Sequence, residues 1–224
     1  MPMPTTPAHP LAAVPLFAGL DATALTNLVI ASRSRHYAGG QILFSEGDPG
    51  DALLLLESGK ILVSRFTLSG REIVLDELSA PAAVGELALI DDQPRSATVT
   101  AVGAVTVRWL GRDAFHEVLD RDPALSRGLL ITLARMVRAT NERLVDALAL
   151  DVPGRLAKWL LAHAATDGIV ALDQSQGALA LGLGTTRVTI NRSLGRFERL
   201  GFVEIEGHSI RIRDRSALQA IADG

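Results

Sequence analysis

Short apolar segments separated by turns constrain residues 37–110 more than any other feature of the chain. The apolar segments are residues 42–44, 61–63, 73–75 and 98–102. The turns, rich in Gly, Pro, Asp or Ser, are residues 39–40, 46–50, 58–59, 68–70 and 91–94. Regularly spaced short strands with such turns are typical of a small antiparallel barrel or roll. We therefore expect a jelly-roll-like antiparallel β-roll here, within an α+β protein.

The segments that flank this region have helical patterns. Residues 16–36 are expected to form a helix, because Asp21 is placed as an N-cap and the apolar residues after it share one face. Residues 112–150 are expected to form one or two helices, with a break at Asp122-Pro123. Flanking helices of this kind would complete a roll domain at residues 14–122.

An apolar stripe runs along the second helical region. Its members are Leu130, Leu133, Val137, Leu144 and Leu148, which lie three, four, seven and four residues apart. Such a stripe on a long helix fits a two-helix seam between subunits. We therefore predict a dimerisation helix at residues 123–150; the alternative is a helix that packs only against its own domain.

The order of elements after residue 150 indicates a winged helix-turn-helix domain at residues 151–224. The expected elements are helices at residues 155–165, 174–184 and 186–200 and a β-hairpin at residues 202–213. Asp151 is placed to cap the first helix, and the hairpin turns at Gly207-His208. Three helices followed by a hairpin are the order that this fold requires.

Charge is distributed unevenly along a chain whose net charge is only −3. Residues 151–224 carry nine Lys and Arg against eight Asp and Glu, and residues 1–150 carry thirteen against seventeen. Between Arg187 and Arg199 there are four Arg and one acid, Glu198. A nucleic-acid site, if present, is therefore local and close to the C-terminus.

Composition excludes several other classes of site. The chain has no cysteine, which excludes disulfides, thiolate zinc sites and cysteine-bound iron–sulfur clusters. No apolar run approaches the length that spans a bilayer, and the Pro-rich start lacks the features of a signal peptide. We expect a cytoplasmic protein that does not contact a membrane, with a disordered leader at residues 1–13.

One stretch of the expected roll, residues 84–99, carries groups suited to a phosphate-bearing ligand. Gly85 allows the backbone to approach a ligand closely, and Glu86 is an acceptor suited to a sugar hydroxyl. Arg95 offers several donors that match a phosphate, and Ser96 adds a hydroxyl. The residues alone leave open a second interpretation, in which Glu86 and Arg95 form an ion pair that closes a loop.

The sequence Gly-Glu-Leu-Ala-Leu-Ile followed by Pro-Arg-Ser-Ala-Thr-Val is similar to the phosphate-binding cassette of cyclic-nucleotide-binding domains. With the C-terminal helices, the chain resembles the cyclic-AMP receptor protein/FNR family over residues 14–220. The resemblance implies that Gly85, Glu86 and Leu87 line the ribose side and that Arg95 and Ser96 hold the cyclic phosphate. It also implies purine contacts from Thr140 and Asn141, and we include Leu75 among the pocket residues.

The resemblance implies cyclic AMP as allosteric effector, with cyclic GMP as the alternative, and no metal, haem or iron–sulfur cluster. Two departures from the family pattern concern the ligand. Residues 80–84 lack the Gly-Asp and aromatic residue that often precede the cassette, and Asn141 stands where the cyclic-AMP receptor protein has Ser. An amide can still serve a purine edge with both a donor and an acceptor. Asn141 also has an alternative role, setting the register of two paired helices without touching a ligand.

The helix expected at residues 186–200 has the pattern of a recognition helix. Its buried face is Ile190, Leu194 and Phe197, which leaves Arg187, Val188, Asn191 and Arg192 outside near its N-terminal end. We expect Arg187 to read a guanine, and Thr186, Arg196 and Arg199 to contact phosphates. Ser175, a candidate N-cap, and Gln176 open the preceding helix and complete the predicted DNA-binding set. Val188 replaces a Glu of the cyclic-AMP receptor protein, so that protein's half-site cannot be transferred whole.

These expectations together describe a DNA-binding transcription regulator controlled by a cyclic nucleotide. It would act as a homodimer on a palindromic double-stranded operator, with RNA polymerase as a further partner. Two alternatives remain open: a DNA-binding regulator of this fold that answers to another ligand or to none, and a sensor that acts through protein partners. An enzyme is not expected, because the sequence has no Walker loop, metal-ligand cluster or paired nucleophile and base.

Overall fold

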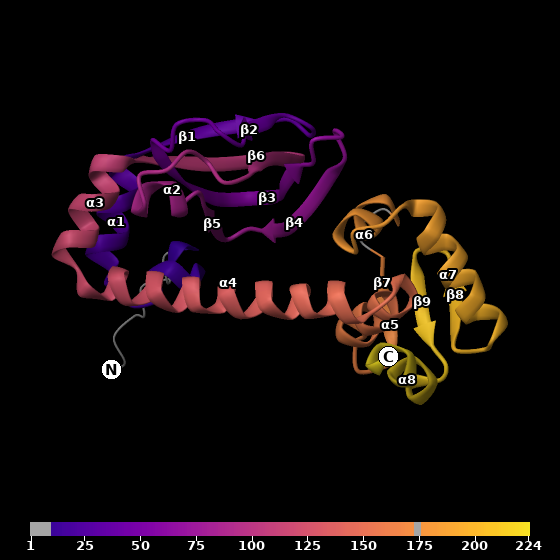
Figure 1. The fold of residues 1–224 in the computed structure, drawn as a ribbon. Coiled ribbons are helices and arrows are strands. Elements are labelled where there is room, and N and C mark those ends of the chain that lie inside the picture. Colours follow the sequence, from indigo (N-terminus) through magenta and orange to yellow (C-terminus); the bar gives the residue numbers. More distant parts are fainter. Residues whose placement is uncertain (1–9, 173–175) are drawn as a thin grey trace, which may run out of the picture. The chain divides into compact units, whose positions relative to one another are not determined.

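The computed structural model describes residues 10–172 and 176–224 and has a mixed helix-and-sheet fold, as predicted (Figure 1). Two compact units divide the chain. The first takes in the described residues up to Gly70 together with Leu75–Val137, and the second takes in Arg71–Val74 and the described part of Arg138–Gly224. The domain boundaries inferred from the sequence stay predictions. Within the described residues, we find no helix with the length and apolar character that crossing a bilayer requires.

The first unit is built on one six-stranded sheet that curls into a roll. Its strands are β1 (Ser32–Tyr37), β2 (Ile42–Phe44), β3 (Ala52–Phe66), β4 (Glu72–Ser79), β5 (Ala82–Val84) and β6 (Thr98–Gly111). The order is β1-β6-β3-β4, with β2 paired to β6 and β5 paired to β3. Strand β6 pairs antiparallel with β1, β2 and β3, so the long strands β3 and β6 form the centre of the roll.

Helices surround one end of this roll (Figure 1). They are the 3-10 helices η1 (Pro10–Ala13) and η2 (Pro15–Phe17) and the α-helices α1 (Ala22–Ile30), α2 (Leu87–Ile90), α3 (Arg112–Arg121) and α4 (Pro123–Ala149). Asp21 caps α1 as predicted, because its carboxylate accepts a hydrogen bond of 2.7 Å from the backbone N–H of Ala24. The helices break at Asp122, also as predicted.

The run Leu53 to Leu56 organises two apolar cores, because successive side chains of a strand point to opposite faces. Leu54 and Leu56 point into the roll, where they meet Ile61, Val99 and Val107. Leu53 and Leu55 point outward, against the helices. Their buried neighbours there include Phe17, Leu28, Leu110, Phe115 and Leu125. A strand that is buried on both faces reads as a continuous apolar run.

Three sequence-based expectations in this unit are wrong in part. Residues 32–36 belong to strand β1 and not to a helix, because they pair with residues 106–110 of β6. Residues 58–59 do not end a strand: β3 continues through them with register shifts, and Gly59 has a φ of 88° that a β-bulge accommodates. Residues 10–13 form η1 with Leu11 buried, so they are not part of a disordered leader; residues 1–9 lie outside the described part of the chain.

The second unit contains the predicted winged helix-turn-helix elements (Figure 1). The predicted helices and hairpin are α5 (Val152–His163), α6 (Gln176–Gly182), α7 (Arg187–Arg199), β8 (Val203–Glu206) and β9 (Ser209–Ile212). The unit also contains β7 (Ile169–Ala171) and α8 (Arg215–Asp223). The sheet order is β7-β9-β8, so β8 is an edge strand. Asp151 caps α5 by accepting a hydrogen bond of 2.9 Å from the backbone N–H of Gly154.

One buried cluster holds this unit together. Its members include Leu156, Leu160, Val170, Leu179, Ile190, Leu194, Phe197, Val203, Ile210 and Leu218. They come from all four helices and all three strands, so α7 is fixed by α5, α6 and the hairpin. Strand β7 and helix α8 were not predicted from the sequence. Strand β7 is only three residues long and pairs with β9, about forty residues later.

Helix α4 exposes most of the predicted apolar stripe. Leu130, Val137, Leu144 and Leu148 are exposed by 68%, 59%, 55% and 80% of their surface, while Leu133 is half-buried. Ile131, Met136 and Val145 widen the exposed apolar surface. A monomeric soluble protein rarely leaves a contiguous apolar surface of this kind uncovered.

Candidate functional site

The turn between β5 and α2 brings Gly85 and Glu86 to the centre of the ligand cassette. Gly85 has a φ of 94°, in the left-handed region that favours glycine. A Cβ at this position would lie 2.5 Å from Nη1 of Arg95. Any side chain would therefore meet the guanidinium as well as backbone strain, and the structure explains why glycine stands there.

Arg95 is buried against this turn, with 3% of its surface exposed. Its Nη1 donates to the carbonyl oxygen of Gly85 at 2.9 Å, and its Nη2 donates to that of Ala52 at 2.6 Å. The guanidinium carbon lies 4.3 Å from the centroid of the Phe44 ring. Burial lowers the pKa of Arg95, and the nearby carboxylate of Asp51 opposes that shift.

The Nε of Arg95 is buried and has no hydrogen-bond partner among the described residues. A buried donor without a partner costs about 1–3 kcal/mol. The same donor gains most from an anionic acceptor, because charge-assisted hydrogen bonds are about twice as strong as neutral ones. A phosphate oxygen therefore fits the chemistry that the cassette leaves unsatisfied.

The carboxylate nearest to Arg95 is that of Asp51, not that of Glu86. Asp51 Oδ1 lies 3.5 Å from Nη2, and the Asp51 side chain is 73% exposed. Among the described residues, no ion pair joins Glu86 to Arg95, so an ion pair does not account for Glu86. Sequence reasoning missed Asp51, because it lies 44 residues before Arg95 and no local pattern marks it.

Glu86 is itself buried, with 6% of its surface exposed. Burial raises the pKa of Glu86, and the backbone N–H groups of Glu86 and Gly85 and the charge of Arg95 oppose that shift. A buried carboxylate in the cassette is suited to accept hydrogen bonds from the hydroxyls of a ligand.

Arg112, at the start of α3, is a second arginine that contacts the cassette, and the sequence analysis did not identify it. Its Nη2 donates to the carbonyl oxygens of Gly50 at 2.5 Å and Ala88 at 2.9 Å, and its Nη1 pairs with the carboxylate of Asp92. Helix α2 is only one turn long, and Arg112 satisfies carbonyl groups at its C-terminal end. It therefore fixes the helix that follows Gly85 and Glu86. With the loops at residues 47–51 and 92–94 it lines a cavity of about 410 Å³.

The other predicted ligand residues lie on α2, β4 and α4 and in the loop directly after Arg95. Leu87 is half-buried at the start of α2, and Ser96 is exposed directly after Arg95. Leu75 lies on β4 and is 39% exposed. Thr140 and Asn141 are exposed on α4 within the second unit, whereas Gly85 and Arg95 belong to the first. The ligand contacts expected of Leu75, Thr140 and Asn141 stay predictions.

Helix α7 presents the predicted DNA-reading residues on its exposed face. Thr186 caps the helix, because its Oγ1 accepts a hydrogen bond of 3.2 Å from the backbone N–H of Thr189. Gly184 has a φ of 66° in the turn that joins α6 to α7. The apolar positions Ile190, Leu194 and Phe197 are buried as predicted. The exposed residues are Thr186, Arg187, Val188, Asn191, Arg192, Arg196 and Arg199.

Several members of the predicted DNA-binding set stay untested. Ser175 lies outside the described residues, and Gln176 is the first residue of α6, with its side chain outside the description. The base and phosphate contacts expected of Arg187, Asn191, Arg192 and Arg196 stay predictions. The exposure of these side chains is compatible with such contacts.

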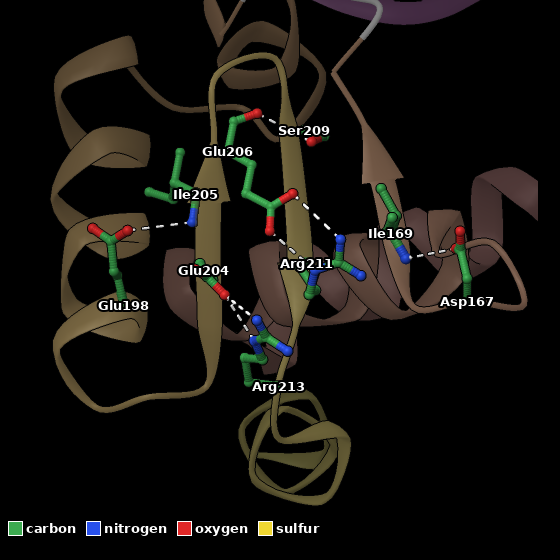
Figure 2. A network of polar contacts seen from close by, with 9 residues as sticks. All are labelled: Asp167, Ile169, Glu198, Glu204, Ile205, Glu206, Ser209, Arg211 and Arg213. Carbon is green, nitrogen blue, oxygen red and sulfur yellow. Dashed lines mark hydrogen bonds and ion pairs between the residues drawn. The ribbon is translucent and has the colours of Figure 1, made fainter.

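Strands β8 and β9 form the predicted wing, which carries a network of ion pairs (Figure 2). Arg211 Nε donates to Glu206 Oε1 at 3.0 Å, and Arg213 Nε donates to Glu204 Oε2 at 2.8 Å. Glu198 of α7 accepts a hydrogen bond of 3.2 Å from the backbone N–H of Ile205. Since β8 is an edge strand, that carboxylate satisfies an edge N–H and ties the wing to α7.

The chain combines a roll that carries this cassette with a winged helix-turn-helix. Together they define a transcription regulator with a ligand-binding and a DNA-binding domain. Residues 34–122 match the family described as cyclic nucleotide-binding domain, and residues 154–221 match the Crp-like helix-turn-helix domain. The chain belongs to the cyclic-AMP receptor protein/FNR family, because it is 34% identical to a CRP-like cAMP-activated global transcriptional regulator of Mycobacterium tuberculosis. That match covers 93% of this chain and 96% of the relative.

A second relative supports this assignment, and a solved structure supports the fold. The chain is 30% identical to a protein named cyclic AMP receptor protein from Thermus thermophilus, over 94% of this chain and 97% of that one. It also resembles the solved structure of a CooA mutant from Carboxydothermus hydrogenoformans, with a TM-score of 0.77 and coverage of 97% of both chains. Identity in that case is 20%, so the likeness bears on the fold alone.

Proposed function

We propose that a cyclic nucleotide, cyclic AMP in the first place, controls the binding of this regulator to DNA. The observation that carries the proposal is the buried Arg95, whose Nε lacks a partner among the described residues beside the left-handed Gly85. An arginine held in this way is oriented for an anion before the ligand arrives, and such preorganisation reduces the cost of binding.

The cassette residues would share the ligand as follows. Arg95 and Ser96 would hold the cyclic phosphate, and Glu86 would accept hydrogen bonds from the ribose. Leu87 and Leu75 would contribute apolar contact. Arg112 would not touch the ligand but would keep α2 in place through the carbonyl oxygens of Ala88 and Gly50.

The active species we propose is a homodimer joined along α4. The support is the exposed apolar stripe of that helix, whose members Leu130, Val137, Leu144 and Leu148 are each more than half exposed. Thr140 and Asn141 lie on the same helix, so a purine bound by them would act directly on the dimer contact. Two copies of α7 would then meet half-sites of a palindromic operator about 34 Å apart.

The name of one relative supports cyclic AMP as the effector and transcription as the process that is regulated. The Mycobacterium tuberculosis relative is named as cAMP-activated and as a global transcriptional regulator. By extension, this chain would act on DNA in the cytoplasm and affect transcription through RNA polymerase. It would act by binding and would not catalyse a reaction.

The experiment is a calorimetric titration of the full chain with cyclic AMP and cyclic GMP, followed by binding to a selected palindromic duplex with and without each ligand. We expect cyclic AMP to bind and to change the DNA affinity by about 5- to 150-fold, the range typical of allosteric coupling. Arg95→Gln should abolish that change. If DNA affinity is the same with and without each nucleotide, the chain is an effector-independent regulator, or one with another ligand, and the proposal is wrong.

A further inference from the structure

One face of the wing carries alternating charges. Along the hairpin, Glu206, Arg211, Glu204 and Arg213 lie on the same side of β8 and β9, as Figure 2 shows. Arg211 donates to both carboxylate oxygens of Glu206, at 3.0 Å and 3.4 Å. Arg213 donates to Glu204 at 2.8 Å. Each arginine of the wing is therefore paired with one carboxylate, and the four side chains together carry no net charge.

The recognition helix differs from the wing in this respect. Among the described residues, Arg187, Arg192, Arg196 and Arg199 form no ion pair with a carboxylate, although all four are exposed. The positive charge of α7 is thus available to a polyanion, and that of the wing is neutralised. Helix α7 therefore presents a net positive charge to DNA, whereas the four paired side chains of the wing present none.

The wing is held beside the recognition helix, so its charge matters to whatever α7 contacts. Glu198 of α7 binds the backbone N–H of Ile205 in β8 at 3.2 Å, and Phe197 and Val203 share the buried cluster of the unit. The hairpin is therefore fixed to the C-terminal half of α7 within the same unit. At physiological salt, an exposed charge acts on a polyanion over about 8 Å.

The stability of the fold does not explain why the wing carries these ion pairs. The arginine side chains are 30% and 55% exposed, and the glutamates are 41% and 47% exposed. Exposed ion pairs contribute little to folding. Each arginine that contacts a phosphate, in contrast, adds about 0.9 to the slope of log affinity against log salt concentration, whatever the DNA sequence.

We propose that Glu204 and Glu206 are specificity-determining residues of the DNA-binding unit. By neutralising Arg211 and Arg213, they keep the wing from adding sequence-independent attraction to phosphates and leave discrimination to the base-reading side chains of α7. The inference rests on the proposed DNA-binding function, because it concerns how that binding is divided between base and phosphate contacts.

The test uses the full chain with Glu204→Gln and Glu206→Gln, singly and together. Binding to a palindromic duplex and to a scrambled duplex is measured by fluorescence anisotropy between about 50 and 200 mM salt, the range over which phosphate contacts have large effects. We expect the double variant to bind the scrambled duplex about tenfold more tightly at the lower salt. Its salt slope should be steeper by about one to two units, or about 0.9 for each arginine released.

A matched control changes the same charge elsewhere in the unit. Asp146 pairs with Lys158 at 2.6 Å, and Asp223 accepts a hydrogen bond from Gln219. Asp146→Asn with Asp223→Asn raises the net charge by the same amount without altering the wing. This control should leave the affinity for the scrambled duplex within about twofold and the salt slope unchanged within about 0.3, less than half of one phosphate contact.

A double-mutant cycle separates release of the arginine from any damage to the hairpin. Arg211→Gln in the native background frees no arginine and leaves Glu206 unpaired, so it should lower the affinity for the scrambled duplex only slightly. In the Glu206→Gln background the same change should remove the gain. If wing and control variants behave alike, or the cycle shows no coupling, the inference is wrong while the proposed function stands. If the native chain binds no duplex at any ligand concentration, both fail.

Discussion

Arg95 Nη1 donates a 2.9 Å hydrogen bond to the carbonyl oxygen of Gly85, ten residues earlier in the chain. The side chain expected to hold a phosphate is thus held in place by the backbone of the glycine expected to approach the ligand. Because Nη2 donates to Ala52 at the same time, the guanidinium links the start of β3 to the turn before α2. The ligand site and the local fold therefore depend on the same arginine.

Replacing Arg95 should weaken ligand binding and also destabilise the first unit, because its guanidinium holds the carbonyl oxygens of Gly85 and Ala52. Arg95→Gln removes the cation and the partnerless Nε, and a hydrogen bond to a charged group contributes about 1.5–3 kcal/mol. We expect cyclic AMP affinity measured by calorimetry to fall about 10- to 100-fold. Arg65→Gln, which alters an exposed arginine paired with Glu46 in the same unit, is the control and should bind as the native chain does.

Gly85→Ala should destabilise the first unit more than an alanine at another left-handed glycine. At Gly85 the new Cβ would lie 2.5 Å from the Arg95 guanidinium, whereas at Gly40, with a φ of 82°, it would meet no atom within 4 Å. Both variants pay for the unfavourable backbone, but only Gly85→Ala must displace Arg95. We expect its unfolding free energy in urea to be lower by about 1–3 kcal/mol relative to Gly40→Ala. Equal values would contradict the close approach.

Glu86→Gln should change how stability depends on pH. Burial raises the pKa of Glu86 in the folded protein. The Glu86 carboxyl therefore contributes most to the stability of the fold below the ordinary glutamate pKa of about 4.3. As the pH rises through the raised folded value, the native chain must ionise a buried group and that contribution is lost. The unfolding free energy of Glu86→Gln should therefore increase relative to that of the native chain as the pH rises from about 4 to 8.

The same variant should bind cyclic AMP more weakly at neutral pH, because an amide is a poorer acceptor than a carboxylate for the ribose hydroxyls. A stability difference that does not vary with pH would show that Glu86 is not desolvated in the folded chain.

Arg112→Met should weaken the binding of cyclic AMP although Arg112 does not contact the ligand. The change deletes the hydrogen bonds to the carbonyl oxygens of Gly50 and Ala88, which fix the end of α2. A typical net hydrogen bond of about 1 kcal/mol corresponds to roughly a fivefold loss of cyclic AMP affinity. Arg112→Lys should not restore it, because one ammonium cannot reproduce the planar fork. Arg121→Gln, on an exposed pair of the same helix α3, is the control.

Two arginines of α7 should affect DNA binding in different ways. Arg187→Ala should cost about 1–3 kcal/mol on the preferred duplex and relax the preference at one base pair. Arg196→Ala should weaken preferred and scrambled duplexes alike and reduce the salt slope by about one unit. Anisotropy titrations against a set of single-base operator variants distinguish the two. If both variants lose affinity uniformly, Arg187 contacts phosphate and does not read a base.

Local chemistry was predictable wherever it spans a few residues. The caps Asp21 and Asp151 accept hydrogen bonds from residues three positions later, and both were predicted. The hairpin turn at Gly207 and the buried face of α7 follow from equally short patterns. The cassette was recognised in the same way, because its turn and its arginine lie within one short segment.

Contacts between distant residues were not predictable in this way. Ser32–Tyr37 is a polar stretch with no strand pattern. It becomes β1 only because β6, 68 to 78 residues later, supplies its hydrogen-bond partners. Asp51 lies in a loop 44 residues before Arg95, and Arg112 begins α3, 24 residues after Ala88. Strand β7 likewise depends on β9.

The sequence by itself determined the family, the cassette, the helices and hairpin of the DNA-binding unit and the exposed face of the recognition helix, because each depends on side chains close together in the chain. Only the tertiary structure decided that Arg95 is held by Gly85 and Ala52 with its Nε unsatisfied, and that the arginines of the wing are neutralised by Glu204 and Glu206. The physical reason is that hydrogen bonding and desolvation depend on which groups folding brings together. A linear pattern of residue types does not specify those distances.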